Sequence, residues 1–537
     1  MRDTNLNVSL RRLARALAAL AASGLAIGVH AAVPGITGPA FNLQAAPGHT
    51  TQPDGTSVYT WGFGCVGSPA GSAPAALSGR CETMQLPGPT LIVTQDDPVE
   101  VTLTNNLPAA AGNTSILFPG FDVTAAPAAT QPAGCVGAPA RTGLLTTEIA
   151  HGCAVTYTFT ASKPGTHAYF SGTQGDLQVE MGLYGALIVL PRLAGGIPAG
   201  YATPAGHPVT CRALADSRPT AGGAETDFRL AAAAYDHPSA CYDREYLFQL
   251  SSMDLGIHYQ VERQKDLACD RPSGCMVVTT EPYVPSYFLV NGRSFPDVTD
   301  PNYAVQYPNQ PYNGNPHMHP GDLVLLRIVG TNRWQHPLHE HGNHIRILAR
   351  DGNLLLTGSA KLAGPLLFTT TSTPGQAMDG IYQWTSKGLN WDIFAHAPAY
   401  TSDTCTPDAN GYYTTASGAA ATAPNYYEWC ADHEKALEAR PFGRVGSGGP
   451  VTLPDPTIVA MGPWYSGSPY FGADAGARSV GATPVPPSGT VANTEGSFAF
   501  MWHSHNEREI TTNNAFPGGM MMMMLVDPWT AVINEAN

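Results

Sequence analysis

Short stretches of alternating apolar and polar residues run along much of the chain, and such patterns are typical of β-strands. Residues 87–93 and 99–105 carry branched apolar side chains between turn formers, and they predict two paired strands of a sandwich. Further strand patterns cover residues 181–189, 243–250 and 321–329. Long amphipathic helical patterns are nearly absent, so we predict an all-β protein.

The composition agrees with this fold class. The chain has 57 Gly, 47 Pro and only 13% charged residues, which favours many short strands joined by turns over long helices. Its 537 residues are enough for two to four domains that each bury a core of their own.

The start of the chain predicts export. Arg2, Arg11, Arg12 and Arg15 precede or flank an apolar run over residues 16–29, and small residues follow it. This order is typical of a signal peptide, which we place at residues 1–31. The apolar run is too short to cross a bilayer and no longer one follows, so we expect a periplasmic or secreted protein without a membrane span.

The cysteines and the net charge further limit which class of protein this chain can belong to. The ten cysteines all lie after residue 64 and show no CxxC spacing, so in an exported protein they predict disulfides. Consecutive pairing would close five short loops, although the connectivity stays open at this point. The net charge of −14 argues against a nucleic-acid partner.

Two pairs of histidines are the strongest sign of metal chemistry. His339 and His341 form one pair, and His503 and His505 form the other. Two residues separated by one position on a strand project from the same face, so each pair can offer two imidazoles to one ion. Imidazole is a suitable ligand for copper, zinc, iron or nickel.

The segments around these pairs resemble the last two copper motifs of the multicopper oxidases. The chain reads HPLHEHG at residues 336–342, where the family has HPxHxHG, and HSH at residues 503–505, where the family has HCH. Residues 87–105 look like the opening of the family's first domain. The resemblance implies three cupredoxin-like Greek-key β-sandwich or barrel domains. We expect them at residues 33–197, 205–298 and 300–537, with a loop-rich insertion at about 362–491 that Cys405 and Cys430 would clip.

The same resemblance implies the role of each histidine. His336 corresponds to a type 1 copper ligand, His339 to a type 2 ligand, and His341, His503 and His505 to type 3 ligands. The type 1 cysteine is replaced by Ser504, and the second type 1 histidine is replaced by Glu509. A serine hydroxyl is a much poorer copper ligand than a thiolate, so we expect no blue copper site.

The first domain departs from the family's pattern at four ligand positions. Leu117 and Pro119 stand where the first motif has histidines, and Phe170 and Gly172 stand where the second has them. None of these side chains can bind a metal. Dioxygen reduction by four coppers is therefore not expected, and the third domain is left with fewer copper ions.

Several other residues could bind metal. His344, Glu507 and Glu509 are candidates for completing the shell, and His317 and His319 form a second HxH pair that reads equally well as a solvated loop. The methionines at 520–524 offer soft thioethers that favour Cu(I), but strand alternation lets only some of them face one site, and core packing is the more ordinary reading. For His167, a lone histidine, the ordinary reading is also a structural one.

The sequence thus predicts a copper-binding protein of this superfamily, with a mononuclear or dinuclear site in the third domain and a metal ion as partner. As an oxidoreductase it would take electrons directly from a small reducing substrate. A scaffold or interaction protein without metal function is the alternative from another class, and manganese oxidation is a third reading that meets the same objection of the missing thiolate.

Overall fold

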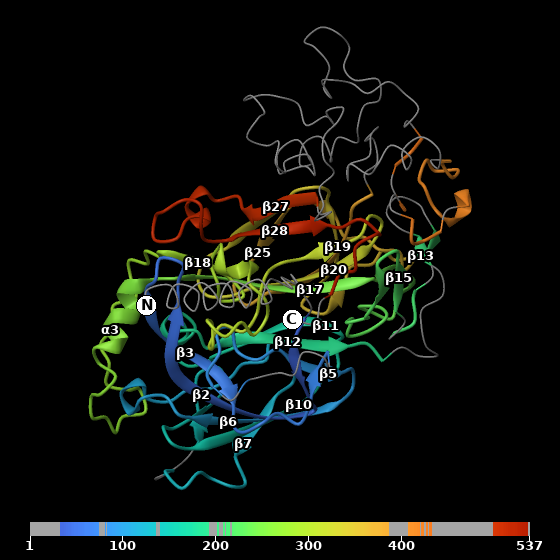
Figure 1. The fold of residues 1–537 in the computed structure, drawn as a ribbon. Coiled ribbons are helices and arrows are strands. Elements are labelled where there is room, and N and C mark those ends of the chain that lie inside the picture. Colours follow the sequence, from blue (N-terminus) through green and yellow to red (C-terminus); the bar gives the residue numbers. More distant parts are fainter. Residues whose placement is uncertain are drawn as a thin grey trace, which may run out of the picture.

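The structure is a computed structural model, which describes residues 33–74, 81, 83–135, 140–192, 201–202, 208–209, 211–214, 217–385, 406–418, 420–423, 426–427, 429–431 and 498–534. The expected signal peptide at 1–31 and most of the expected insertion lie outside these residues. Nearly all regular elements are strands (Figure 1). The α-helices of the described part are α2 (Gly175–Gln178) and α3 (Leu255–Glu262). The all-β prediction is therefore confirmed.

Two five-stranded sheets form a first sandwich. One sheet has the order β11 (Gly165–Phe170), β12 (Tyr184–Leu190), β5 (Leu91–Thr94), β1 (Gly35–Thr37), β4 (Ser72–Ala73). The other has the order β3 (Ser57–Cys65), β2 (Ala40–Thr51), β6 (Pro98–Asn105), β10 (Ala154–Thr160), β7 (Thr124–Pro127). The two stretches expected to pair with each other, β5 and β6, instead lie in opposite sheets. The turn between them carries the chain across the sandwich, so the prediction of direct pairing was wrong.

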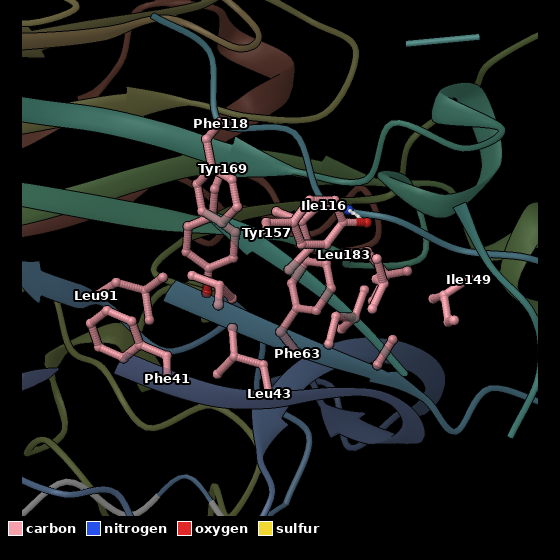
Figure 2. Packing of buried hydrophobic residues seen from close by; sticks show 14 of the residues in the cluster. Phe41, Leu43, Phe63, Leu91, Ile116, Phe118, Ile149, Tyr157, Tyr169 and Leu183 are labelled. Carbon is pink, nitrogen blue, oxygen red and sulfur yellow. Dashed lines mark hydrogen bonds between the residues drawn. The ribbon is translucent and has the colours of Figure 1, made fainter. Parts of the chain in front are cut away.

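The core of this first sandwich follows from the alternation of its strands. β6 alternates buried and more exposed positions along its length, as the sequence pattern predicts. Leu43, Phe63, Leu91, Tyr157 and Tyr169 meet between the two sheets and are almost completely buried (Figure 2).

A seven-stranded sheet and a five-stranded sheet form a second sandwich. The first of these, which we call the inner sheet, has the order β18 (Tyr287–Val290), β17 (Arg244–Met253), β20 (Leu323–Gly330), β26 (Ala377–Gln383), β22 (Ile345–Arg350), β23 (Asn353–Leu354), and β24 (Leu366–Leu367) also pairs with β22. The second, which we call the outer sheet, has the order β19 (His317–Met318), β28 (Met521–Val526), β27 (Phe498–Ser504), β21 (His336–Glu340), β25 (Thr369–Ser372).

This topology corrects two of the expected boundaries. β17 and β18, which open and close the expected second domain, pair within the inner sheet, and β17 runs parallel to β20 of the expected third domain. The described residues of 205–298 therefore form no sandwich of their own. The insertion was also expected to begin at about residue 362, but β24, β25 and β26 belong to the two sheets. β26 is buried at every position and contains Gly380 and Asp379, so it shows no alternating strand pattern in the sequence.

The two sandwiches pack against each other through the inner sheet. β11 of the first sandwich contacts β20 and β26 of the second. Ile92, Ala186 and Ile188 pack with Leu247 and Val329 in one apolar cluster across this seam. The outer sheet, with β27 and β28, lies on the far side of the second sandwich (Figure 1).

Shorter elements complete the described chain. They are the hairpins β8 (Ala140–Thr142) with β9 (Thr147–Ile149), β13 (Tyr201–Ala202) with β14 (Pro208–Val209), and β15 (Arg218–Thr220) with β16 (Gly223–Glu225), and the 3-10 turns η1 (Ala109–Ala111), η2 (Pro238–Ala240), η3 (Asp297–Thr299), η4 (Thr415–Ser417) and η7 (Glu507–Ile510). None of the described helices has the length and apolar character needed to cross a membrane.

The described cysteines pair consecutively along the chain. The disulfides are Cys65–Cys81, Cys135–Cys153, Cys211–Cys241 and Cys269–Cys275. These four confirm the consecutive pairing. Cys430 is also disulfide-bonded, and Cys405 lies outside the described residues.

Candidate metal centre

The two histidine pairs lie side by side on the outer sheet. β21 and β27 are antiparallel neighbours, and their register places His339 directly opposite His503. His341 and His505 follow two residues later, directly after the ends of β21 and β27, and have the same parity as the first two. All four imidazoles therefore lie on the face of the outer sheet that is turned away from the inner sheet, and we call this group the histidine cluster.

The cluster is compact. Ring centroids lie 4.9 Å apart for His339 and His341, 4.8 Å apart for His339 and His505, and 5.3 Å apart for His341 and His503. The Nε2 atoms of His341 and His503 are 3.3 Å apart. His339 is nearly buried, whereas His505 is exposed, so the cluster opens toward solvent at one end.

Burial lowers the pKa of three of these imidazoles, those of His339, His341 and His503. Burial is the main cause that lowers the pKa of both His339 and His341 to about 4, and the neighbouring histidines add to the effect. The pKa of His503 is lowered as well, again mainly by burial. Only neutral imidazole can bind a metal, so these ligands are available at neutral pH.

A hydrogen bond also fixes the tautomer of His503. Nδ1 of His503 lies 2.8 Å from the carbonyl oxygen of Ser504. A carbonyl can only accept, so Nδ1 carries the proton and Nε2 of neutral His503 presents its lone pair to His341. Nδ1 of His339 contacts the Thr369 hydroxyl at 2.7 Å, which holds that ring in place.

Few further side chains stand ready to complete a coordination shell around the histidine cluster. Within the part of the chain that the structure describes, no group of three or more His, Cys, Asp or Glu side chains is arranged to hold a metal ion. Of the expected shell residues, Glu507 is exposed and its charge acts on His503, whereas His344 stacks edge-on against Phe368.

The positions expected to form the type 1 site lie on the other face of the outer sheet. His336, Ser504 and Glu509 are all buried between the two sheets. The Ser504 hydroxyl donates to Glu509 Oε2 at 2.5 Å, and His336 Nδ1 lies 3.0 Å from the same oxygen. His336 is thus separated from the other four predicted ligands by the sheet itself, and Glu509 cannot complete the shell of the cluster.

Glu340 is a buried acid that sequence reasoning did not single out. It lies between His339 and His341 but points to the opposite face, where Thr370 Oγ1 donates to it at 2.5 Å. Burial raises the pKa of its carboxyl to about 8, so it is neutral at pH 7. Its position between two outward-facing histidines could have indicated an inward carboxyl, because side chains alternate along a strand.

The methionine run divides between the two faces of β28. Met520 precedes the strand and is buried, and Met522 and Met524 point into the core of the second sandwich, where they pack with Trp502 and Phe500. Met521 and Met523 have the opposite parity and share the outer face with the histidine cluster. Core packing therefore accounts for three of the five methionines.

The second HxH pair is held by carboxylates and a carbonyl. His317 Nδ1 lies 2.7 Å from Asp527 Oδ2, and His319 Nε2 lies 2.7 Å from Glu225 Oε1. His319 Nδ1 also contacts the Asp527 carbonyl at 2.8 Å. Both rings are buried, so neither the exposed chelate nor the solvated loop expected from the sequence is found. Asp527 and Glu225 are far from His317 and His319 in the sequence, so no local pattern could predict these contacts.

His167 is also a structural residue. It is 2% exposed, its Nε2 contacts the carbonyl oxygen of Lys163 at 2.9 Å, and its ring packs on Phe121. Burial lowers its pKa. The ordinary reading of this lone histidine agrees with these contacts.

Three of the four first-sandwich positions where the sequence departs from the family's pattern line one cleft. Leu117 and Phe170 form a β-bridge, and with Gly172 they line a cleft of about 240 Å³. Asn332 and Pro374, which follow β20 and β25, line its other side. The cleft is at the seam between the sandwiches, whereas the histidine cluster is on the outer face of the outer sheet.

Comparisons with known proteins agree with the resemblance found in the sequence. Residues 83–194 match the family described as multicopper oxidase. A segment of 127 residues is 35% identical to laccase-1 of Emericella nidulans, covering 23% of this chain and 18% of that protein. The chain thus spans less than a fifth of that relative.

Solved multicopper oxidases have similar arrangements of strands. The multicopper oxidase mgLAC is 14% identical with a TM-score of 0.43, covering 91% of this chain and 85% of that one. A blue copper oxidase from Nitrosomonas europaea is 15% identical with a TM-score of 0.41, covering 90% and 85%. Likenesses of this size carry no argument about the site. The match over residues 83–194 and the all-β structure agree with the resemblance to the multicopper oxidases seen in the sequence.

Proposed function

We propose that this protein binds copper through the histidine cluster on the outer sheet. The observation that carries the proposal is the convergence of four imidazoles from two adjacent strands, with the Nε2 atoms of His341 and His503 3.3 Å apart. Two nitrogens bound at about 2.0–2.1 Å to one tetrahedral ion would be separated by about this distance. His341 and His503 therefore fit one ion as they stand.

The remaining ligands would come from the same face. His339 and His505 have ring centroids 4.8 Å apart, and each is also within 6 Å of His503 by centroid distance. A change of side-chain rotamer would turn either ring toward the ion that His341 and His503 hold. Copper bound there would supply one-electron chemistry, and we propose one ion or two in place of the four of complete multicopper oxidases.

Conventional laccase turnover is not part of this proposal. His336 has the hydroxyl of Ser504 and the carboxylate of Glu509 beside it, with no thiolate, so the inner site fits no blue copper ion. The first-sandwich positions line a cleft on the other side of the inner sheet. An oxidoreductase built on this site would need a small substrate that delivers electrons directly at the outer face.

We also propose that the protein is exported to the periplasm or the medium. The four disulfides of the described residues are typical of proteins in an oxidising compartment. The pattern at residues 1–31 resembles a signal peptide, which would direct export. Sequencing the N-terminus of the protein recovered from a periplasmic extract would test this, with a retained Met1 as the contradicting result.

The decisive experiment is a titration of the purified protein with Cu(II) at pH 7, read by elemental analysis after dialysis. We expect one or two coppers per chain and none for the double variant His503→Ala/His505→Ala. The matched control is His49→Ala, an exposed histidine of the first sandwich, which should bind copper as the unmodified protein does. Equal copper in the double variant would place the metal elsewhere, and no copper in the unmodified protein would favour the scaffold reading.

Thermal unfolding gives a second readout. A ligand that binds only the folded state stabilises it by about 2.7 kcal/mol at a hundredfold excess over its Kd. Copper should therefore raise the Tm of the unmodified protein and leave that of the double variant unchanged. The copper-loaded protein should also lack the intense blue absorption of copper–thiolate bonding, because Ser504 provides no sulfur.

A further inference from the structure

The outer face of β27 and β28 carries thioethers next to the histidine cluster. The register of the two strands places Met501 opposite Met523 and His503 opposite Met521. All four share one face, because residues two apart on a strand point the same way. We call Met501, Met521 and Met523 the outer methionines. They extend the row of histidines along the sheet by one further pair of positions.

These side chains do not belong to the apolar cluster between the two sheets of the second sandwich. Met520, Met522 and Met524 are 0–1% exposed and fill the second sandwich, as flexible methionines commonly do. Met501 and Met523 are partly exposed on the opposite face, and Met521 is 4% exposed. A single exposed methionine would need no explanation, but three on adjacent strands beside four imidazoles form a group with common chemistry.

That chemistry is the binding of soft cations. Directly opposite residues of an antiparallel pair have Cβ atoms about 4.5–5.5 Å apart, and methionine has three rotatable side-chain bonds, so two sulfurs can converge on one ion. Thioethers select Cu(I) and have little affinity for hard cations such as magnesium or calcium. No carboxylate stands among these positions of β27 and β28 to compete for the ion.

We propose that Met501 and Met523, with Met521 beside them, form a Cu(I) site that is distinct from the histidine cluster and adjacent to it. The proposal does not depend on Cu(II) binding by the histidines. It assigns the outer methionines as ligands of a monovalent soft ion, and it involves binding alone, without electron transfer.

Protonation separates the two sites in an experiment. Imidazole nitrogens lose metals as they take up protons, whereas thioethers do not titrate. We would measure Cu(I) binding anaerobically at pH 7 and at pH 3.5, in competition with a chromogenic Cu(I) chelator that is calibrated at each pH. The unmodified protein should retain one Cu(I) equivalent at the lower pH, provided that circular dichroism shows it to be folded there.

The double variant Met501→Leu/Met523→Leu removes two sulfurs and keeps the apolar volume. It should lose this acid-resistant equivalent, with at least a tenfold weaker Cu(I) affinity at pH 7, and it should keep the copper(II) stoichiometry of the unmodified protein. The control is Met524→Leu, the inward neighbour on the same strand, which should bind Cu(I) normally. Unchanged Cu(I) binding in the double variant would overturn the proposal.

X-ray absorption of the Cu(I)-loaded unmodified protein keeps the proposal testable even if the variant fails to fold. Sulfur in the first coordination shell is the expected result, since every described cysteine is in a disulfide and the sulfur must come from methionine. A shell of nitrogen and oxygen alone would refute the proposal. Failure of the histidine proposal would appear differently, as missing Cu(II) with Cu(I) still bound.

Discussion

Single residues of β21 serve opposite faces of the outer sheet. His339 and His341 point outward to the cluster, whereas Glu340, between them, is fully buried against Thr370. An isolated buried carboxyl is expensive to ionise, which is why the pKa of Glu340 is raised to about 8. The motif that offers imidazoles to a metal thus also brings a neutral acid into the core.

Replacing Glu340 by Gln should change how stability depends on pH. In the unfolded chain this carboxyl titrates near its ordinary pKa of 4.5, so between pH 4.5 and 8 the unfolded state loses a proton that the folded state keeps. The folded protein therefore loses stability as pH rises through this window, by an amount on the order of 2–4 kcal/mol. Glu340→Gln is neutral throughout and should not show this loss.

Urea unfolding at pH 5 and at pH 8 measures the effect. The free energy of unfolding of Glu340→Gln, relative to the unmodified protein, should be higher at pH 8 than at pH 5. The exposed Glu507→Gln serves as the control and should follow the unmodified protein at both values. Parallel curves for Glu340→Gln would show that the carboxyl is ionised in the folded state.

At the scale of elements, β26 is the strand that the sequence pattern concealed. It lies between β20 and β22 and is buried along its whole length. Gly380 at its centre has no room for a side chain, because an added Cβ would lie 2.4 Å from Ile345 Cγ2 and 3.2 Å from the Arg346 carbonyl oxygen. A glycine in mid-strand weakens a sequence-based strand prediction, yet here close packing requires it.

Gly380→Ala should therefore destabilise the protein by about 1–3 kcal/mol, as overpacking in a closely packed core does. The matched control is Gly358→Ala, where an added Cβ meets nothing within 4 Å and the change should stay within about 0.5 kcal/mol. The midpoints of urea unfolding at one pH give both values. A Gly380→Ala variant as stable as the control would contradict the central position of β26.

At the scale of the whole molecule, the carboxylate of Asp379 forms hydrogen bonds across the seam between the two sandwiches. Asp379 of β26 accepts hydrogen bonds from the Thr166 amide at 3.0 Å, the Thr166 hydroxyl at 2.6 Å and the Tyr235 hydroxyl at 2.6 Å. Arg327 lies 3.7 Å away, and all of these groups are buried. Polar groups that cross a buried seam make the two sandwiches unfold as one unit, because separation exposes them together.

Asp379→Ala should cost about 3–5 kcal/mol, since it leaves Thr166, Tyr235 and Arg327 without their shared acceptor. In calorimetry, the single unfolding transition expected for the unmodified protein should separate into two. The control is Asp236→Ala, an exposed carboxylate next to Tyr235, which should keep one transition at nearly the original Tm. A single, unshifted transition in Asp379→Ala would show that the seam does not depend on this residue.

The relation between sequence and site differs from residue to residue. The two HxH pairs were predictable because alternation on a strand is a local rule, and the register of β21 and β27 brings them together as the motifs imply. His336 was expected at the separate type 1 position, and it lies on the inner face with Glu509, because its parity along β21 is opposite to that of His339. The partners of His317 and His319 lie 210 and 94 residues away in the sequence, respectively, and only the fold reveals them.

The sequence by itself determined the all-β class and the two histidine pairs, because these depend on strand periodicity and on neighbours along the chain, whereas it predicted disulfides without fixing their connectivity. The tertiary structure alone decided that 205–298 contributes strands to the inner sheet, that β26 completes this sheet, and that the seam cleft and the histidine cluster are on opposite sides of the second sandwich. Those features arise from strand pairing between distant segments, whose order no local pattern of residues specifies.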